Sequence, residues 1–449
     1  MSDRTLRIFQ TVKDSEDRLT EKPAVPWVPD DQGIETPLIN VHPDVTFQTI
    51  EGFGGAFTEA GAVTLDRMSA GRRAEILNAY FNPDTGIGYS LCRTHINSCD
   101  FSTGNYAYVD DPRDTELRTF SVSRDEQSLI PFIRDAAKVN GADFKLFASP
   151  WSPPAWMKTN GQMNRGGKLK KECEAVWAKY YVKYVEAYAQ RGIAIWGLSV
   201  QNEPKAAQSW DSCLYTADEE KDFVKNHLGP ALERAGMRHV KIIIWDHNKE
   251  RVFERAKAAF SDPAASRYIW GVGFHWYSGD HFEALAITQK AFPDKHLLFT
   301  EGCQEGGVKL GSWHTAERYG HDMIGNLTHG AVGFVDWNLV LDERGGPNHV
   351  GNFCDAPIIA DTRTDAVIYE SSLYYLGHFS RFIRPGAVRI GHSRYTDKLE
   401  VCAFRNLDGG LVVIVLNRTD ATLPFTLRCE SAGIVPLQSQ PHSLMSLLY

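Results

Sequence analysis

Two glutamates in this sequence follow apolar runs of the kind that form buried strands. Glu203 follows the apolar part of "IWGLSVQNEP", between Asn202 and Pro204, and Glu301 ends the apolar part of "HLLFTEGC". A lone glutamate is usually a salt-bridge or helix-capping residue. Two carboxylates opposed in one pocket, however, can split an acetal, because one attacks the anomeric carbon and the other, its pKa raised by the like charge, protonates the leaving oxygen. A separation of about 5–5.5 Å would specify the retaining route.

Aromatic residues at other predicted strand ends fit a sugar pocket. Trp151, Tyr277 and Trp337 each follow or end an apolar run. Their flat faces can pack against the C–H face of a pyranose, although any one of them has about even odds of being a core residue. Together with the two carboxylates, they favour a carbohydrate substrate.

Polar residues near the same strand ends complete the predicted site. Asp100 and Asn352 can hydrogen-bond sugar hydroxyls, and Arg93 can hold the carboxylates in position, although a lone Asp or Arg is more often a surface or salt-bridge residue. His275 ends an apolar run two residues before Tyr277. The predicted substrate-binding residues are Arg93, Asp100, Trp151, Asn202, His275, Tyr277, Trp337 and Asn352.

Eight apolar runs between residues 48 and 384 must position these groups, and helix-like segments separate most of them. The helical segments include "AGRRAEILNAYF" and "AVWAKYYVKYVEAYAQRG", the second of which stops at Gly192. This alternation predicts a (β/α)8 TIM barrel, with Glu203 and Glu301 at the ends of its fourth and seventh strands. An open doubly wound sheet is the alternative. The glycine-rich "GFGGAF" lacks the GxGxxG spacing of such sheets and predicts a tight turn.

The last 65 residues have a different pattern (449 − 384). They are rich in strand-like alternation, contain the hairpin signal "LDGG" at 407–410 and lack helical periodicity. We predict an attached antiparallel β-sandwich, made of residues 1–47 and 385–449, beside a catalytic barrel of residues 48–384.

Composition excludes several classes of partner. The 48 basic and 56 acidic residues give a net charge of −8 without a long basic run, so we expect no nucleic-acid partner. The longest aliphatic run, "LVVIVL", is too short for a membrane span. The charged start "MSDRTLRIFQ" is unlike a secretory signal, and the eight cysteines form no CxxC, so we expect reduced thiols and a cytoplasmic location. No cluster has metal-ligand spacing, and we predict neither metal nor cofactor. No pattern specifies an oligomeric state.

A series of motifs resembles glycoside hydrolase family 30, specifically its glucosylceramidase (acid β-glucosidase)-like branch. The motifs run in order from "EGFGGAFTEA" through "LFASPWSPPAWMKTNG", "QNEP", "FHWY" and "TEGC" to "VDWNLVLDERGGPN". The resemblance implies a barrel with a β-sandwich and retaining hydrolysis of β-glucosides. It implies that Glu203 is the acid/base, that Glu301 is the nucleophile and that Asn202 binds the sugar 2-OH. It also places Arg93 beside the carboxylates.

Departures from that branch lie at two positions. Gln201 stands where relatives often have Glu, and His349 stands where the lysosomal type has Trp. We expect both changes near the aglycone entrance. The predicted function is therefore a retaining β-glycosidase, a glucosylceramidase or β-glucosidase, acting on a small-molecule or lipid-linked β-glucoside. The alternatives are a β-1,6-glucanase or β-xylosidase of the same family, and a catalytically silent carbohydrate-binding protein.

Overall fold

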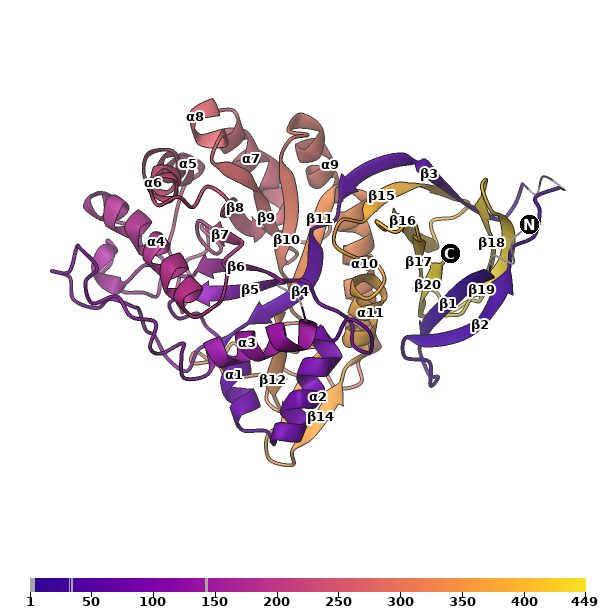
Figure 1. Ribbon diagram of the computed structural model, residues 1–449, viewed down its shortest axis with the longest axis horizontal. Coiled ribbons are helices and arrows are strands. Elements are labelled where there is room, and N and C mark those ends of the chain that lie inside the picture. Colours follow the sequence, from indigo (N-terminus) through magenta and orange to yellow (C-terminus); the bar gives the residue numbers. More distant parts are fainter. Residues whose placement is uncertain (1–4, 32, 34, 142–143) are drawn as a thin grey trace.

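A computed structural model describes residues 5–31, 33, 35–141 and 144–449. Figure 1 shows two parts side by side: a barrel surrounded by helices and, beyond α10 (Trp313–Thr328) and α11 (Ser371–Ser380), a curved sheet that holds both the first and the last described strands. No helix among the described residues is long and apolar enough to cross a bilayer.

The barrel consists of eight parallel strands and closes where β11 pairs with β4. Its predicted architecture is confirmed, and Glu203 and Glu301 follow or end the fourth and seventh strands of the ring. In chain order the strands are β4 (Gly52–Phe57), β5 (Leu91–Ile96), β6 (Lys145–Pro150), β7 (Gly197–Ser199), β8 (Lys241–Asn248), β9 (Ile269–His275), β10 (His296–Glu301) and β11 (Ala331–Asn338).

Helices cover the outside of the barrel, and their apolar faces explain their positions. In α2 (Ala70–Phe81), Ser69 caps the first turn, and Ile76, Leu77, Tyr80 and Phe81 are buried at helical spacing. The other helices are α1 (Glu59–Asp66), α3 (Leu129–Asn140), α4 (Glu174–Gln190), α5 (Ala217–Phe223), α6 (Gly229–Arg234), α7 (Val252–Phe260), α8 (Pro263–Ser266) and α9 (Phe282–Ala291); short 3-10 turns cover Ala155–Met157, Lys171–Cys173 and Lys249–Arg251, and a π-helical turn covers Val224–Leu228. The two predicted helices are thus confirmed as α2 and α4.

The reading of "GFGGAF" as a tight turn was wrong, because these residues form the buried strand β4. Its glycines serve close packing. A Cβ on Gly54 would lie 1.7 Å from the carbonyl oxygen of Leu91 on the neighbouring strand, and one on Gly55 would lie 2.8 Å from Leu339. A strand with small residues lets its neighbours approach closely, and sequence spacing alone did not distinguish this from a turn.

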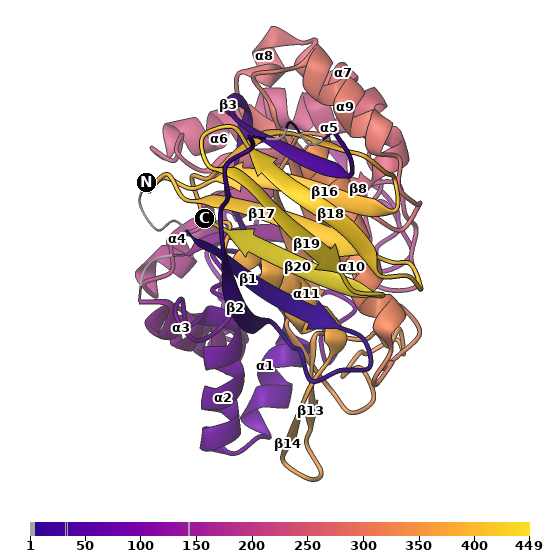
Figure 2. The same ribbon diagram turned by 90° about the vertical axis from the view of Figure 1, so that its right-hand side faces the viewer.

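The second part is one nine-stranded sheet in the order β19-β18-β3-β15-β16-β17-β20-β1-β2. Figure 1 shows it curling, so that β18 and β19 lie opposite β16 and β17, and Figure 2 shows it from its outer side. This separate β-sandwich part was predicted, but the pairing of β18 with β3 is parallel. The strands are β1 (Thr5–Val12), β2 (Thr20–Pro26), β3 (Leu38–Thr49), β15 (Val388–Arg394), β16 (Leu399–Arg405), β17 (Leu411–Asn417), β18 (Leu423–Cys429), β19 (Gly433–Ser439) and β20 (Ser443–Leu448).

Two smaller features complete the fold. The predicted "LDGG" turn joins β16 to β17 as an antiparallel hairpin, with Gly409 at φ +89°. Next to the barrel, an unpredicted three-stranded sheet contains β12 (Val340–Asp342), β13 (Ile358–Asp361) and β14 (Ala366–Tyr369). The segment between β12 and β13 carries Asn352 and Cys354 to the open end of the barrel, where both line a cavity.

Candidate active site

A cavity of about 170 Å³ lies at the carboxyl ends of the barrel strands, the face on which barrel enzymes place their sites. Six of the eight predicted substrate-binding residues line it together with both glutamates. Arg93 and His275 do not; they are completely buried behind the carboxylates. The lining residues are Asp100, Trp151, Asn202, Glu203, Gln208, Trp210, His247, Asn248, Tyr277, Glu301, Cys303, Glu305, Trp337, Asn352 and Cys354.

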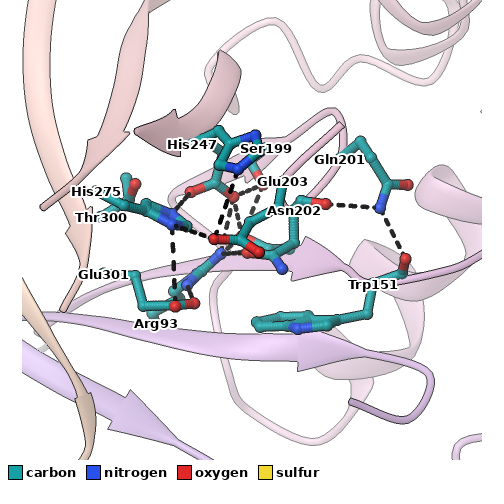
Figure 3. Close-up of polar contacts among 12 residues, drawn as sticks. Arg93, Trp151, Ser199, Gln201, Asn202, Glu203, His247, His275, Thr300 and Glu301 are labelled. Carbon is teal, nitrogen blue, oxygen red and sulfur yellow. Dashed lines mark hydrogen bonds and ion pairs between the residues drawn. The ribbon is translucent and has the colours of Figure 1, made fainter. Parts of the chain in front are cut away.

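Glu203 and Glu301 face each other in this cavity. One carboxylate oxygen of each, together with a ring nitrogen of His275, lies within 4.8 Å of the other two atoms. Figure 3 shows the two carboxylates facing one another beside His275, with Glu301 at the end of β10 and Glu203 in the segment after β7. This spacing allows both carboxylates to reach one small group held between them.

Irregular backbone after β7 presents Glu203. The strand ends at Ser199, so Glu203 lies four residues beyond it. Neighbouring strands supply the missing bonds: Asn202 N–H donates to the carbonyl of Pro150 at 2.9 Å, and Glu203 N–H donates to that of Asp246 at 3.0 Å. Glu203 itself has φ +47°. Left-handed backbone costs a residue with a Cβ on the order of 1 kcal/mol, and such strain is concentrated at functional sites.

Arg93 on β5 connects the residues behind the cavity. Its Nη1 donates to Glu301 Oε2 at 2.5 Å, and its Nη2 donates to Asn202 Oδ1 and Asp246 Oδ2, each at 2.8 Å. Both Arg93 and Asp246 have 0% exposed side chains. Because a buried charge is tolerated only when it is paired, this guanidinium fixes the positions of three groups at once.

His275 on β9 bridges Glu203 and Asp246. Its Nδ1 lies 3.2 Å from Glu203 Oε1, and its Nε2 lies 3.0 Å from Asp246 Oδ1. Although burial opposes it, the charge of Glu301 and the hydrogen bonds to Asp246 and Glu203 raise the pKa of His275 to about 9. The imidazole is therefore protonated at neutral pH, and both of its nitrogens donate.

The two glutamates differ in their proton affinity. Burial raises the pKa of Glu301, and the nearby charge of Glu203 adds to this effect, against the cations His275 and Arg93. Burial alone would also raise the pKa of Glu203, but the hydrogen bond from His275 and the charges of His247 and His275 lower it. The sequence prediction gave the raised pKa to Glu203. The structure instead raises the pKa of Glu301 and lowers that of Glu203, to which His275 makes its hydrogen bond.

The sugar-facing walls contain the predicted aromatic and polar groups. Trp151 and Trp337 stack with ring centroids 5.0 Å apart, and the hydroxyl of Tyr277 donates to Glu301 Oε1 at 2.9 Å. Asp100 accepts from the amide of Asn352 at 3.1 Å, and burial raises its pKa to about 7. One wall is therefore flat and apolar, and another offers hydrogen-bonding groups, a combination suited to a sugar.

Gln201 and His349 are not among the residues that line the cavity, and their place near the aglycone entrance stays a prediction. Gln201 is buried, and its Nε2 donates to the carbonyl of Trp151 at 2.7 Å, pointing away from the carboxylates (Figure 3). His349 Nδ1 lies 3.2 Å from the carbonyl oxygen of Ser102. Both side chains hold loops behind the cavity wall.

Sequence reasoning missed one central residue, Asp246. It ends the apolar part of "KIIIWDHN" as Glu301 ends that of "HLLFTEGC", so the same pattern indicated it. Its Oδ2 accepts from Ser149, Ser199 and Arg93. Burial opposes ionisation, but the charge of Arg93 and the hydrogen bond from His275 hold the pKa of Asp246 well below its usual range.

Three atoms of this cluster also satisfy the spacing of metal ligands: one each from Glu203, His275 and Glu301. All three side chains already have protein partners. His275 is hydrogen-bonded to Glu203. Glu301 accepts hydrogen bonds from Arg93 and from Tyr277. A protonated His275 has no free nitrogen for a metal. The site as built supports proton and carboxylate chemistry.

The comparison with known families agrees with this geometry. Residues 50–383 match the description "Glycosyl hydrolase family 30 TIM-barrel domain", and residues 386–447 match "Glycosyl hydrolase family 30 beta sandwich domain". The chain belongs to glycosyl hydrolase family 30. It is therefore a glycoside hydrolase, and the resemblance drawn from its motifs is confirmed.

Individual proteins are similar to this chain over most of their own length. The lysosomal acid glucosylceramidase of Mus musculus is 37% identical over 431 residues, which cover 92% of this chain and 83% of that one. The crystal structure of SrfJ from Salmonella typhimurium has a TM-score of 0.96 at 43% identity, with 99% of both chains covered. A solved endo-β-1,6-glucanase has a TM-score of 0.90 at 28% identity, again with 99% of both chains covered.

Proposed function

We propose that this family 30 enzyme is a retaining β-glycosidase that hydrolyses β-glucosides, with Glu301 as nucleophile and Glu203 as general acid/base. The observation that supports it best is the spacing of the two carboxylates, whose nearest oxygens lie within 4.8 Å of each other at the wall of one cavity. A covalent glycosyl–enzyme needs this short separation.

In the first step, Glu301 attacks the anomeric carbon while Glu203 protonates the departing oxygen. Arg93 and Tyr277 donate to the two oxygens of Glu301, which holds that carboxylate in one orientation. In the second step, water attacks the glucosyl–enzyme with Glu203 as the base, and Glu301 is released. Asn202, fixed by Arg93, is placed to bind the sugar 2-OH.

The proton that Glu203 gives to the leaving group can come from His275. Its pKa of about 9 keeps the imidazole protonated, and Nδ1 lies 3.2 Å from Glu203 Oε1. As the leaving oxygen gains negative charge beside Glu203, the His275 proton passes to Glu203 and from Glu203 to that oxygen, which leaves Glu203 as the carboxylate that acts as base in the second step. Because these groups titrate together, the pH profile of turnover should report the cluster rather than any single residue.

A glucosylceramide or small β-glucoside is the preferred substrate class. The 37% identity with the mouse glucosylceramidase covers 92% of this chain, against 28% for the solved β-1,6-glucanase. The glucanase remains a second candidate because its structure covers 99% of this chain with a TM-score of 0.90. The two candidates share the pocket for the cleaved sugar and differ in what lies beyond it.

A substrate panel followed by proton NMR tests this proposal. Aryl β-glucosides, aryl β-xylosides, a β-1,6-linked glucan and glucosylceramide would be assayed side by side, with the anomer of the first product recorded. We expect β-glucosides to be cleaved with the β-anomer appearing first. An α-anomer formed first would overturn the retaining mechanism, and a preference for the β-1,6-glucan would favour the second candidate.

A further inference from the structure

Two cysteine thiols meet at the wall of the proposed sugar cavity. Cys303 and Cys354 are buried free cysteines, and their Sγ atoms lie 3.1 Å apart. Both residues line the cavity that contains Glu203 and Glu301. Cys303 follows the proposed nucleophile by two positions, and its Sγ lies 3.5 Å from the Tyr277 hydroxyl that donates to Glu301.

Backbone pairing brings these thiols to the same side of two loops. Glu305 and Cys354 form an isolated antiparallel bridge, and Asp355 N–H donates to the carbonyl of Gln304 at 2.8 Å. Residues two apart on an extended segment point to the same face, so Cys303 shares a face with Glu305 and with its partner Cys354. The contact of the sulfur atoms is thus a product of the fold.

We propose that Cys303 and Cys354 form a redox-active pair whose disulfide reversibly lowers the glycosidase activity. Hydrogen peroxide is the oxidant. The first thiol is oxidised to a sulfenic acid as the peroxide O–O bond breaks and one water leaves. The second thiol then attacks that sulfur, the S–S bond forms and a second water leaves. A dithiol reductant restores both thiols by exchange.

The cavity controls how fast this oxidation runs. A peroxide molecule can reach the sulfurs only through the opening that admits a sugar, since both residues are otherwise buried. The hydrogen bond with Cys354 and burial together raise the pKa of Cys303 well above its usual value. Because the thiolate is the nucleophile, we expect slow oxidation at neutral pH that accelerates as the pH rises.

Closing the disulfide should disturb the proposed nucleophile. The sulfurs must approach from 3.1 Å to about 2.05 Å. Aromatic rings pack closely against Gly302, because a Cβ there would lie 2.7 Å from Phe299 and 2.8 Å from Trp276. We therefore expect the Cys303 side chain and the loop that carries Cys354 to move, and the contact between Cys303 and Tyr277 to change. A misplacement of about 1 Å in a site can cost about 10²-fold in rate, so we expect kcat to fall by about tenfold or more.

The test treats the whole protein with hydrogen peroxide, blocks the remaining thiols and maps the tryptic peptides. Residues 296–309 carry Cys303, and residues 345–363 carry Cys354. We expect these two peptides to be linked, with kcat lowered and then restored by dithiothreitol. In Cys354→Ser, and separately in Cys303→Ala, the ratio of oxidised to reduced activity should stay near one. Cys402→Ala, which removes a buried cysteine of β16, is the matched control and should keep the full response.

The effect of the disulfide on turnover rests on the proposed glycosidase function, whereas the linkage of the two peptides does not. The two proposals can therefore fail separately. Oxidation that leaves the two peptides unlinked would overturn the pair, whatever the activity. Linked peptides with unchanged kcat would overturn its effect on turnover. If the reduced protein cleaved no glycoside, the proposed function would fail, and the linked peptides would still test the pair.

Discussion

The mouth of the barrel and the interior of the nine-stranded sheet bury different kinds of group. Behind the cavity, Arg93, Asp246 and His275 are completely buried and charged. Inside the sheet a large cluster of apolar side chains is buried; its members include Ile39, Val401, Val415, Leu427 and Leu447. The backbone differs as well. At the barrel mouth positive φ is found at Glu203 and Asp246, whereas in the sheet part Asp14, Gly409 and His442 have it in connections between strands.

This difference shows which region serves chemistry and which serves stability. Buried ion pairs gain little net stability because desolvation offsets their attraction, whereas apolar burial contributes roughly 25 cal/mol per Å². The charges at the mouth are therefore best explained by what they do to Glu203 and Glu301. Substitutions there should reduce turnover far more than substitutions in the sheet, and substitutions in the sheet should mainly reduce stability.

The largest expected effect is at the proposed nucleophile. Glu301→Gln keeps the shape of the side chain but removes the charge that attacks the anomeric carbon, so kcat/KM on an aryl β-glucoside should fall at least about 10⁴-fold. The measurement is steady-state kinetics, with thermal unfolding to confirm an unchanged fold. Glu283→Gln, on the outer helix α9, is the control and should behave as the wild type. Near-normal activity in Glu301→Gln would contradict the assignment.

Removing the guanidinium behind the site should have the next largest effect. Arg93→Met leaves Glu301 and Asp246 without the cation they share, and we expect a loss of about 10²–10³-fold in kcat, the range for a preorganised electrostatic partner. Arg113→Met, with a side chain 88% exposed, is the matched control. If Arg93→Met changed only the unfolding temperature and left kcat intact, the arginine would be a structural residue.

A core substitution in the sheet should show the opposite pattern. Leu427→Ala removes a buried side chain from the apolar cluster, and its cost in the free energy of unfolding should be about 2–5 kcal/mol. Measured below the unfolding transition, kcat should stay within about twofold of the wild type, because no cavity residue lies in the sheet. A large loss of kcat would break the division between the two regions.

The smallest effect concerns pH and His378, at the contact between α11 and the sheet. This buried histidine bonds to Ser446 and Thr11, and burial lowers its pKa to about 3 from the usual 6.5. Between these values the unfolded chain binds the proton and the folded one does not, so stability should fall as the pH drops below 6.5. In His378→Asn that component of the pH dependence should disappear. Parallel curves of unfolding free energy against pH for the two proteins would refute it.

Much of this arrangement was predictable from the sequence, because apolar runs ending in polar residues are local signals. That pattern located Glu203 and Glu301, and the helical spacing located α2 and α4. The same pattern is present at Asp246. The sequence around a carboxylate that pairs with an arginine does not differ, however, from the sequence around one that contacts substrate.

What the sequence did not reveal depends on contacts between distant segments. "GFGGAF" is a strand because its glycines admit neighbouring strands, and β3 pairs in parallel with β18 across most of the chain. The lowered pKa of Glu203 depends in part on a hydrogen bond from His275, which reaches it from another strand. The spacing of residues along the chain does not reveal which distant segments come into contact.

Trapping of the intermediate tests the central claim most directly. The protein would be incubated with a 2-deoxy-2-fluoro-β-glucosyl fluoride, whose fluorine slows the second step more than the first, and analysed by mass spectrometry. The account predicts one added fluoroglucosyl group, located on Glu301 by peptide mapping. A label on another residue, or rapid turnover with no covalent adduct at any time, would contradict it.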